Sequence, residues 1–547
     1  MEHYLDRLQR TVKSDWNGLA VCDFKGEEFT FGRLAETIAK LHVIFDNAGL
    51  EKEQKVALCA KNCCRWAVSF LAMNTYEFVS VPILADFHPD SVNHLVDHSE
   101  SILLFTDMEH FKTLDVTKMP LLKGIFDIAD FSLLYCADDK LKAAVDGADA
   151  AFAAKYPNGF TAADVVYPTD NDKMLSVINY TSGTTSAPKG VMLKYESISA
   201  TTDFAVRYIP ATPEDSIVSM LPMAHIYGFA YEFLYPLTCG VTVYYLGKTP
   251  SPSVLLKAMA EVKPYLVITV PLVMEKIYKS SLKPVLDKPA MKILTKIPGV
   301  NTILYKKIRE KLLTTFGGKV KQFIMGGAAL NPEVEKFFRK IHLPYTVGYG
   351  MTECAPLLAY ARPEIFAQGS CGRGIDCTEV RIDSEDPQNI VGEIQAKGPN
   401  VTIGYYHNEE ATKSAFTEDG FLHTGDLGVM DAQGNIFIRG RSKNMILSAN
   451  GQNIYPEEIE AVVNAQDYVV ESVCVDRSSR LVVLVYIDQD ALKKAGLDEE
   501  AISDIPETVR KNSNKALPSY SQISKIEVVP TPFEKTPKMS IKRFLYK

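Results

Sequence analysis

Short apolar runs alternate with helical patterns between about residue 175 and residue 350, and this alternation limits the possible folds more than any other feature. Runs such as "DSIVSMLP", "VTVYYLG" and "YLVITVP" have the length and β-branched content of buried strands. A pair of parallel strands needs a long crossover connection, which a helix usually supplies. The pattern therefore predicts an α/β fold in which helices cover both faces of mainly parallel sheets.

The character of the sequence changes after about residue 440. A helical segment, "YPEEIEAVVNAQ", precedes a hairpin pattern in "VVESVCVDRSSRLVVLVYID", and a further helix and a last strand follow. The chain has 547 residues, which is enough for more than one domain. We therefore predict a large α/β domain over residues 1–441 and a small α+β domain over residues 442–547.

The charge and cysteine content argue against several classes of protein. Asp and Glu (67) outnumber Lys and Arg (59), so the chain lacks the basic surplus with which nucleic-acid-binding proteins neutralise phosphates. Ten cysteines without a CxxC motif suggest neither a zinc site nor a disulfide framework, and they suit a reducing cytoplasm. No apolar run is long enough to span a bilayer, so we expect any membrane contact to be peripheral, at the inner face. The sequence indicates no obligate protein partner.

A polar turn between two apolar runs lies in "VINYTSGTTSAPKGVML", residues 177–193. Glycines let a backbone approach a ligand, hydroxyl groups donate to anionic oxygens, and Lys189 supplies a mobile positive charge. These are the groups that bind a polyphosphate. The spacing is not that of a Walker A loop, and on its own the stretch is equally compatible with an ordinary polar loop.

Four further blocks follow in order: "FIMGGAAL" at 323–330, "VGYGMTECAP" at 347–356, "FLHTGDLG" at 421–428 and "IRGRSKNMILSANGQNIYPEEIE" at 438–460. With the first stretch, they resemble the adenylate-forming superfamily of acyl-CoA synthetases, firefly luciferase and peptide-synthetase adenylation domains. The resemblance covers nearly the whole chain. It implies that a carboxylate attacks the α-phosphate of ATP, with Mg²⁺ bound, and expels pyrophosphate, and that coenzyme A then takes the acyl group.

The resemblance assigns a role to individual residues. Lys189, with its loop, matches the residues that hold the β- and γ-phosphates, Thr352 the contact to the α-phosphate, and Glu353 a ligand of Mg²⁺, with Thr184 as a second candidate ligand. Asp426 matches the acceptor for the ribose hydroxyls, although an Asp in "TGD" is commonly only a turn former. The full set implied for ATP or AMP is Thr181, Ser182, Gly183, Thr184, Thr185, Lys189, Gly326, Gly327, Ala328, Tyr349, Gly350, Met351, Thr352, Asp426, Ile438 and Arg441.

Two residues of this set illustrate the alternatives. Tyr349 is expected to lie against the adenine, with Gly326, Gly327 and Ala328 leaving its other face open, but it could also be a core aromatic residue at a strand end. Arg441 matches a cation near the ribose and phosphate.

Coenzyme A is expected to enter by a tunnel beside His225 and Gly451. His225 matches a family residue next to the carboxylate and serves there as a steering group or gate, although a lone histidine is more often structural. Lys443 matches the hinge about which the small domain rotates between the two half-reactions.

The last family block departs from the pattern. Aligning "FEKTPKMSIKRFLYK" on Lys535 and Ile541 places Ser540 where the family carries a lysine that bridges carboxylate and phosphate. The loss of this charge puts the adenylation step in doubt and leaves the CoA step untouched. Lys538 or Lys542 could replace it if the segment is extended, and a deliberately introduced serine is a further possibility. A smaller departure is Ser186, where the family usually has glycine.

The segment from "VITVPLVMEKIYKS" to "KKIREKLLTTFGGKVKQF" resembles the long-chain fatty acyl-CoA synthetase branch. The expected substrate is a medium- or long-chain fatty acid. Its acyl pocket would be lined by Tyr227, Gly228, Val270 and Pro271. Two other functions remain open: transfer of the acyl group to a carrier protein, and binding of a nucleotide or acyl-adenylate with impaired adenylation because of Ser540.

Overall fold

Two seven-stranded sheets form the centre of the large domain. The structure is a computed structural model, and it describes residues 1–181, 188–247, 252–447, 453–477, 480–496, 498–536 and 541–546. The first sheet has the order β14-β13-β12-β10-β11-β1-β2, with β1 Leu19–Asp23, β2 Glu28–Thr30, β10 Ser216–Ser219, β11 Thr242–Tyr245, β12 Leu266–Thr269, β13 Gln322–Met325 and β14 Tyr345–Val347. The second has the order β7-β6-β5-β3-β4-β8-β9, with β3 Lys55–Cys59, β4 Val79–Pro82, β5 Ser101–Thr106, β6 Gly124–Asp127, β7 Leu133–Cys136, β8 Leu175–Thr181 and β9 Lys189–Lys194.

The strands inside both sheets pair in parallel, as the alternating pattern predicts. Antiparallel pairs lie at the sheet edges, where β2, β7 and β9 each fold back on a neighbour. The helices of this domain are α1 Tyr4–Ser14, α2 Phe31–Asn47, α3 Cys64–Thr75, α4 Pro89–His98, α5 Met108–Phe111, α6 Asp139–Asp146, α7 Ala148–Lys155, α8 Tyr195–Tyr208, α9 Ile226–Gly228, α10 Tyr235–Thr238, α11 Pro252–Val262, α12 Pro271–Ile277, α13 Lys283–Leu286, α14 Pro289–Leu294, α15 Val300–Thr315, α16 Pro332–Lys340 and α17 Glu409–Ser414. Two π-helical segments, η3 Phe229–Leu234 and η4 Tyr278–Leu282, continue α9 and α12.

Further strands complete the large domain, and the sequence did not predict them. The short strands β15 Tyr349–Gly350, β16 Leu357–Tyr360 and β17 Arg373–Gly374 form one small sheet. An antiparallel sheet contains β18 Glu379–Asp383, β19 Gly392–Lys397, β20 Leu422–Met430 and β21 Ile436–Arg441. The large domain is therefore an α/β structure with an antiparallel addition before the small domain.

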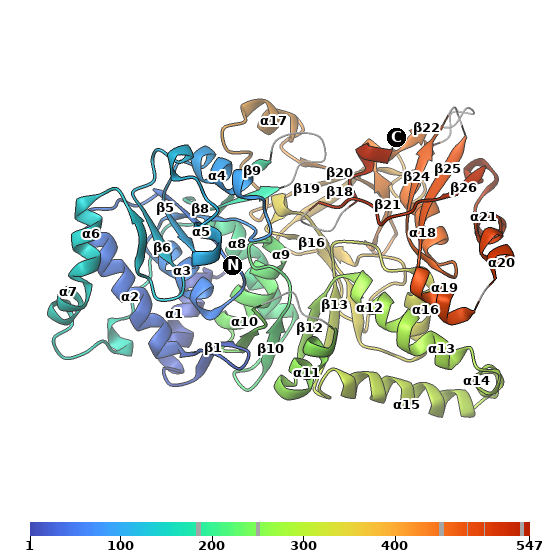
Figure 1. Cartoon of the computed structure of the whole chain (residues 1–547), viewed down its shortest axis with the longest axis horizontal. Coiled ribbons are helices and arrows are strands. Elements are labelled where there is room, and N and C mark those ends of the chain that lie inside the picture. The colour runs from blue at the N-terminus through green and yellow to red at the C-terminus, as the bar shows by residue number, and fades with distance from the viewer. Residues whose placement is uncertain are drawn as a thin grey trace.

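A small α+β domain follows, orange to red in Figure 1, at the opposite end of the molecule from α6 and α7. The predicted hairpin is present, because β24 Val469–Asp476 pairs antiparallel with β25 Leu481–Ile487, and β26 Lys525–Val528 lies parallel to β25. Buried side chains of α18 and α21, such as Ile459 and Val509, pack in one apolar cluster with the sheet. The other elements are β22 Ile446–Leu447, β23 Asn453–Ile454, α18 Pro456–Asn464, α19 Gln489–Ala495, α20 Glu499–Ser503 and α21 Ile505–Ala516.

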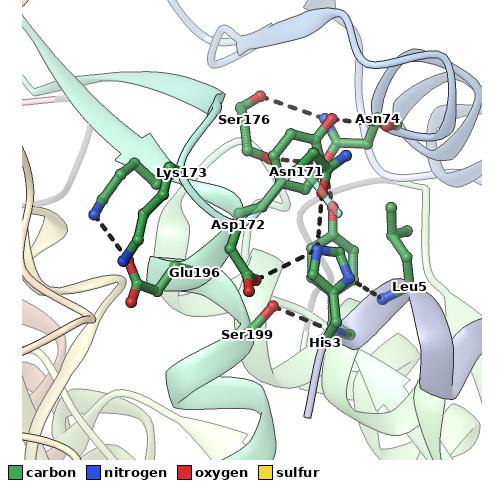
Figure 2. A network of polar contacts seen from close by, with 12 residues as sticks. His3, Leu5, Asn74, Asn171, Asp172, Lys173, Ser176, Glu196 and Ser199 are labelled. Atoms are coloured by element: carbon green, nitrogen blue, oxygen red, sulfur yellow. Dashed lines mark hydrogen bonds and ion pairs between the residues drawn. The ribbon is translucent and has the colours of Figure 1, made fainter. Parts of the chain in front are cut away.

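A buried polar network fixes α1 to the strand that leads into the polar turn (Figure 2). The ring of His3, just before α1, lies 3.0 Å from Asn171 Oδ1 through its Nε2, and the amide of Asn171 donates to Glu77 Oε1. The Tyr4 N–H donates to Ser199 Oγ on α8. Burial lowers the pKa of His3, so the ring is neutral in this network. These contacts hold α1 against the segment that precedes β8 and against α8.

Lysine side chains join the two domains. Lys279 Nζ donates to the backbone oxygens of Asn464, at 2.7 Å, and Val469, at 3.3 Å. Lys283 Nζ lies 3.0 Å from Asp467 Oδ1. Burial lowers the pKa of Lys279, which agrees with its position inside the contact.

None of the described helices is both long enough and apolar enough to cross a membrane.

A buried ion pair anchors the C-terminal segment to the small domain. Glu460 accepts hydrogen bonds from the Arg543 guanidinium and from the Cys474 N–H, and burial raises the pKa of Glu460 to about 7. We predict that Arg543→Ala destabilises this domain by about 3 kcal/mol, because Glu460 is left buried without its cation. Below the raised pKa Glu460 becomes neutral, so the loss should shrink as the pH falls.

Hydrogen exchange at the Cys474 amide tests this prediction. As a matched control, Arg477→Ala removes a more exposed ion pair, with Glu527, and should cost below about 1 kcal/mol. Equal protection factors in the two variants would show that the buried pair does not anchor the segment.

Candidate active site

The polar turn predicted to bind polyphosphate connects β8 and β9. Thr181 ends β8 and pairs directly with Lys189 at the start of β9, and Thr181 Oγ1 donates to the Lys189 carbonyl oxygen at 3.4 Å. The intervening candidates Ser182, Gly183, Thr184, Thr185 and Ser186 lie outside the described residues. The hairpin therefore fixes both ends of the turn.

Lys189 and Glu353 come together across one aromatic ring. Lys189 Nζ lies 4.9 Å from the centre of the Tyr405 ring, and the Tyr405 hydroxyl donates to Glu353 Oε1 at 3.0 Å. Burial and the charge of Glu353 raise the pKa of Tyr405, so its hydroxyl remains a neutral donor. A cation and a carboxylate from distant parts of the sequence thus share one ring.

Backbone contacts hold Thr352 and Glu353 in place. Both residues are buried in the 3₁₀ turn η5, Thr352–Cys354, and the Thr402 N–H donates to the Glu353 carbonyl oxygen at 2.7 Å. Neither Tyr405 nor Thr402 was predicted from the sequence. Gly404 lies between them and has a positive φ of 132°. The glycine in "TIGYY" indicates a turn in the sequence, but nothing in this stretch links the turn to Lys189.

Asp426 lies between a tyrosine and an arginine. The Tyr349 hydroxyl donates to Asp426 Oδ2 at 2.8 Å, and Arg441 Nε lies 3.0 Å from Asp426 Oδ1. The contact with Arg441 follows from the sheet, because Asp426 on β20 and Arg441 on β21 are direct partners in the register. Burial raises the pKa of Asp426, while Arg441 and Tyr349 act in the opposite direction.

The remaining members of the predicted nucleotide set lie near these strands. Ile438 is exposed on β21, Gly350 is exposed on β15, and Met351 is half-buried after it. Gly350 has no room for a side chain, because a Cβ there would lie 1.9 Å from the Pro356 carbonyl oxygen.

His225, Tyr227 and the glycine turn after β13 are neighbours. His225 Nδ1 accepts from the Tyr227 N–H at 3.3 Å and so caps α9. The Tyr227 ring faces Gly326, where a Cβ would lie 3.0 Å from the ring carbon Cζ. Gly327 has a φ of 84°, which favours glycine, and both it and Ala328 are exposed.

The other predicted acyl-pocket residues lie next to Tyr227 or follow a residue that contacts it. The Tyr227 hydroxyl donates to the Thr269 carbonyl oxygen at 3.4 Å, and Val270 and Pro271 follow Thr269 at the start of α12. Gly228 is buried against the Pro222 carbonyl oxygen, which a Cβ would approach to 2.7 Å. The absence of a side chain at Gly228 is therefore required by backbone packing.

The buried side chain of Glu232 and the half-buried side chain of Asn62 clamp the loop that carries His225. Glu232 Oε2 accepts from the N–H groups of Met220, at 2.9 Å, and Leu221, at 2.8 Å. Asn62 Oδ1 accepts from the Met223 N–H at 2.8 Å. Glu232 was not predicted from the sequence, because nothing in "GFAYEFLY" marks its single carboxylate as a loop anchor.

Glu232 should give the fold a pH dependence. Burial raises its pKa from 4.5 to about 8, so the folded chain binds this proton more tightly than the unfolded chain does. The resulting stability is fully present below pH 4.5 and is lost as the pH rises through about 8. We predict that Glu232→Gln reduces the fall in melting temperature between pH 6 and pH 8.

Thermal melts across this range provide the measurement. Glu418→Gln, at an exposed site in the same domain, is the matched control and should reproduce the parent curve. A Glu232→Gln curve parallel to that of the parent would exclude the proposed proton uptake.

The predicted hinge and the last block are described in part. Lys443 is exposed in the turn Ser442–Asn444, directly after Arg441, and the Asn444 amide donates to Glu457 Oε1 at 2.6 Å. Gly451, Lys538 and Ser540 lie outside the described residues. Lys542 Nζ lies 2.6 Å from Glu534 Oε1, so in this conformation its charge is paired within the small domain.

Within the described residues, no three His, Cys, Asp or Glu side chains gather into a metal cluster. All ten cysteines are free thiols.

Comparison with known proteins places the chain in a family. A family model described as AMP-binding enzyme matches residues 8–406, and one described as AMP-binding enzyme C-terminal domain matches residues 443–546. Probable acyl-activating enzyme 16, chloroplastic, of Arabidopsis thaliana is 26% identical over 91% of this chain and 78% of its own length. The long-chain-fatty-acid–CoA ligase FadD15 of Mycobacterium bovis is 27% identical over 90% of this chain and 86% of its own length.

Solved structures agree on the fold. ATP-bound MatB from Rhodopseudomonas palustris superposes with a TM-score of 0.77 at 22% identity, covering 100% of this chain and 98% of that one. The anthranilate CoA ligase AuaEII in complex with anthranoyl-AMP gives a TM-score of 0.79 at 17% identity, covering 99% and 96%. Because the family model spans well over half of the sequence, the chain belongs to the AMP-binding enzyme family of adenylate-forming proteins.

Proposed function

We propose that the chain is a fatty acid–CoA ligase that uses ATP and Mg²⁺. It would join a medium- or long-chain fatty acid to AMP with release of pyrophosphate, and then transfer the acyl group to coenzyme A with release of AMP. The observation that carries the proposal is the meeting of Lys189 and Glu353 across Tyr405, because a cation suited to phosphate and a carboxylate suited to a metal ion then lie close together.

In this proposal the chain binds the triphosphate with the β8–β9 turn and Lys189. Thr352 contacts the α-phosphate, and Glu353 holds Mg²⁺. The donor chemistry fits, since Mg²⁺ prefers a carboxylate together with phosphate oxygens and water, and Tyr405 occupies one oxygen of Glu353. A bound Mg²⁺ would neutralise the charge that develops on the departing pyrophosphate.

Asp426 and Tyr349 would bind the nucleoside. The carboxylate of Asp426 is the acceptor for the ribose hydroxyls, and Arg441 opposes the rise in its pKa that burial causes. The Tyr349 hydroxyl is fixed by Asp426, which sets the orientation of the ring toward the adenine. The chain thus prearranges both contacts before ATP arrives.

The acid and coenzyme A would meet at the His225 loop. His225 steers the carboxylate, Tyr227, Gly228, Val270 and Pro271 line the acyl pocket, and Gly451 lies along the CoA tunnel. The name of FadD15 supports a long-chain acid for the protein that it describes, and we extend that substrate class to this chain. Rotation about Lys443, after a domain boundary at residue 441, would exchange the two half-reactions. The free cysteines support a cytoplasmic location.

Ser540 favours a second candidate function. A chain without the bridging lysine would bind ATP or an acyl-adenylate and form the adenylate slowly. The pairing of Lys542 with Glu534 supports this alternative, because it holds one replacement cation in the small domain.

Product analysis distinguishes the two functions. The chain is incubated with Mg-ATP, coenzyme A and fatty acids from acetate to oleate, and acyl-CoA is identified by mass spectrometry. The ligase yields acyl-CoA with a maximum at one chain length. ATP binding without acyl-CoA for any acid would support the second candidate, and discharge to a carrier protein but not to coenzyme A would indicate carrier loading.

A further inference from the structure

One segment of the large domain carries a charge opposite to that of the whole chain. Residues 271–321, which we call the basic arm, contain twelve Lys and Arg and three Asp and Glu, a formal net charge of +9. The complete chain has a net charge of −8. The arm is therefore a concentrated positive region on an otherwise acidic protein.

Several cations of the arm are available to an external partner. Lys279 and Lys283 hold the small domain, and Lys292 lies 3.1 Å from Asp287. By contrast, the exposed residues Lys296 and Lys307 form no ion pair with a residue in the described ranges. Their charges are free to act on an anionic surface.

The same arm exposes large apolar side chains. Ile293 is 63% exposed and Ile303 is 61% exposed, and Val285 and Ile297 are also exposed. α14 and the start of α15 lie at the far end of the arm, at the lower right of Figure 1. The described residues leave these aliphatic groups exposed to water, so burial against a partner would be favourable.

Apolar and basic side chains share one face of α15. Val300, Ile303, Lys307 and Lys311 follow one another at intervals of three or four residues, so they lie on one side of the helix. Leu312, on the other side, is only 4% exposed and belongs to the core. This face therefore combines aliphatic groups, which gain from leaving water, with cations that anionic headgroups attract.

We propose that the basic arm docks on an anionic lipid bilayer, with Ile293, Ile297 and Ile303 in the headgroup region and the lysines on the lipid phosphates. The charge of the arm complements such a surface, and isolated aliphatic side chains on a projecting tip suit a fluid partner. An acidic protein is disfavoured, because a protein interface typically uses a wide complementary patch rich in aromatic residues. The proposal does not depend on the proposed ligase reaction.

Vesicle sedimentation of the full chain tests the proposal. Vesicles of phosphatidylcholine alone are compared with vesicles of equal parts phosphatidylcholine and phosphatidylglycerol, at low and high salt. We expect binding to the anionic vesicles that weakens with salt. Lys296→Glu/Lys307→Glu should lower the partition coefficient by at least about tenfold, since each lysine near an anionic surface contributes about fivefold.

Two further variants make the test specific. Ile293→Ser/Ile303→Ser should also weaken binding, while keeping its salt dependence. Lys140→Glu/Lys142→Glu makes the same change of charge on α6, at the opposite end of the molecule, and should bind like the parent (Figure 1). No binding by the parent, equal loss in the α6 control, or no effect of the arm variants would each overturn the proposal.

Discussion

Replacing Asp426 by Asn is expected to lower the rate of acyl-adenylate formation about 10²–10³-fold. The substitution keeps the size of the side chain but removes the charge that Arg441 holds at 3.0 Å. It also weakens the hydrogen-bond acceptor of the Tyr349 hydroxyl. We therefore expect a weaker contact with the ribose and a less well-defined orientation of the Tyr349 ring. Single-turnover formation of acyl-AMP is the measurement.

Two controls separate this effect from damage to the sheet. Asp383→Asn changes an exposed carboxylate on β18 of the same sheet and should leave the rate unchanged. Tyr349→Phe keeps the Asp426 carboxylate and removes one hydrogen bond, so its effect should be smaller. An Asp426→Asn enzyme as fast as the parent would remove Asp426 from the proposed nucleotide site.

Replacing Ser540 by Lys is expected to act in the opposite direction. If the family lysine bridges carboxylate and phosphate in the transition state, restoring its charge should raise the rate of acyl-adenylate formation about 10²–10³-fold. Thioester formation from added acyl-adenylate should change little, because the implied role of the lysine is confined to the first half-reaction. The two half-reactions are measured separately.

Ser540→Met is the matched control, because it adds length without charge. Lys542→Ala and Lys538→Ala test whether either lysine already supplies the cation. If one of them does, the variant that lacks it forms the acyl-adenylate more slowly than the parent. A Ser540→Lys enzyme with the parent's rate, together with a slow Lys542→Ala enzyme, would show that Lys542 does the work of the missing lysine.

Local patterns were enough to predict the elements with strong periodicity. Asn331 followed by Pro332 is the local signature of a helix start, and α16 begins at Pro332 with Asn331 Oδ1 accepting from the Glu333 N–H at 2.9 Å. The strands β10 to β12 are confirmed where β-branched runs alternate with helices. In each case neighbouring residues contain the information, because capping groups and buried strands have short-range signatures.

The pairing of strands that are distant in the sequence could not be predicted from local patterns. The turn signal of β8–β9 predicted a loop between strands but not that β9 forms an antiparallel edge of a sheet separate from β10 to β14. The sheet β18–β21 was missed because three of its strands have only five or six residues, and a long connection that contains α17 separates β19 from β20. Its register nevertheless determines the contact of Asp426 with Arg441.

The residue types at the candidate site were predictable, and their supporting contacts were not. The family blocks supplied Lys189, Glu353 and Asp426 as candidates, and these remain proposals. The roles of Tyr405 and Glu232 could not be predicted from the sequence, because each forms hydrogen bonds with residues outside its own local segment. A single aromatic or acidic residue carries no local sign of such a partner.

The most direct test of the central proposal is the exchange of labelled pyrophosphate into ATP, measured with Mg²⁺ and without coenzyme A. This exchange occurs only if the chain forms an acyl-adenylate reversibly. We predict exchange that requires a fatty acid and that falls in Asp426→Asn. Tight ATP binding with no acid-dependent exchange, in the parent and in Ser540→Lys alike, would contradict the assignment of an adenylating enzyme.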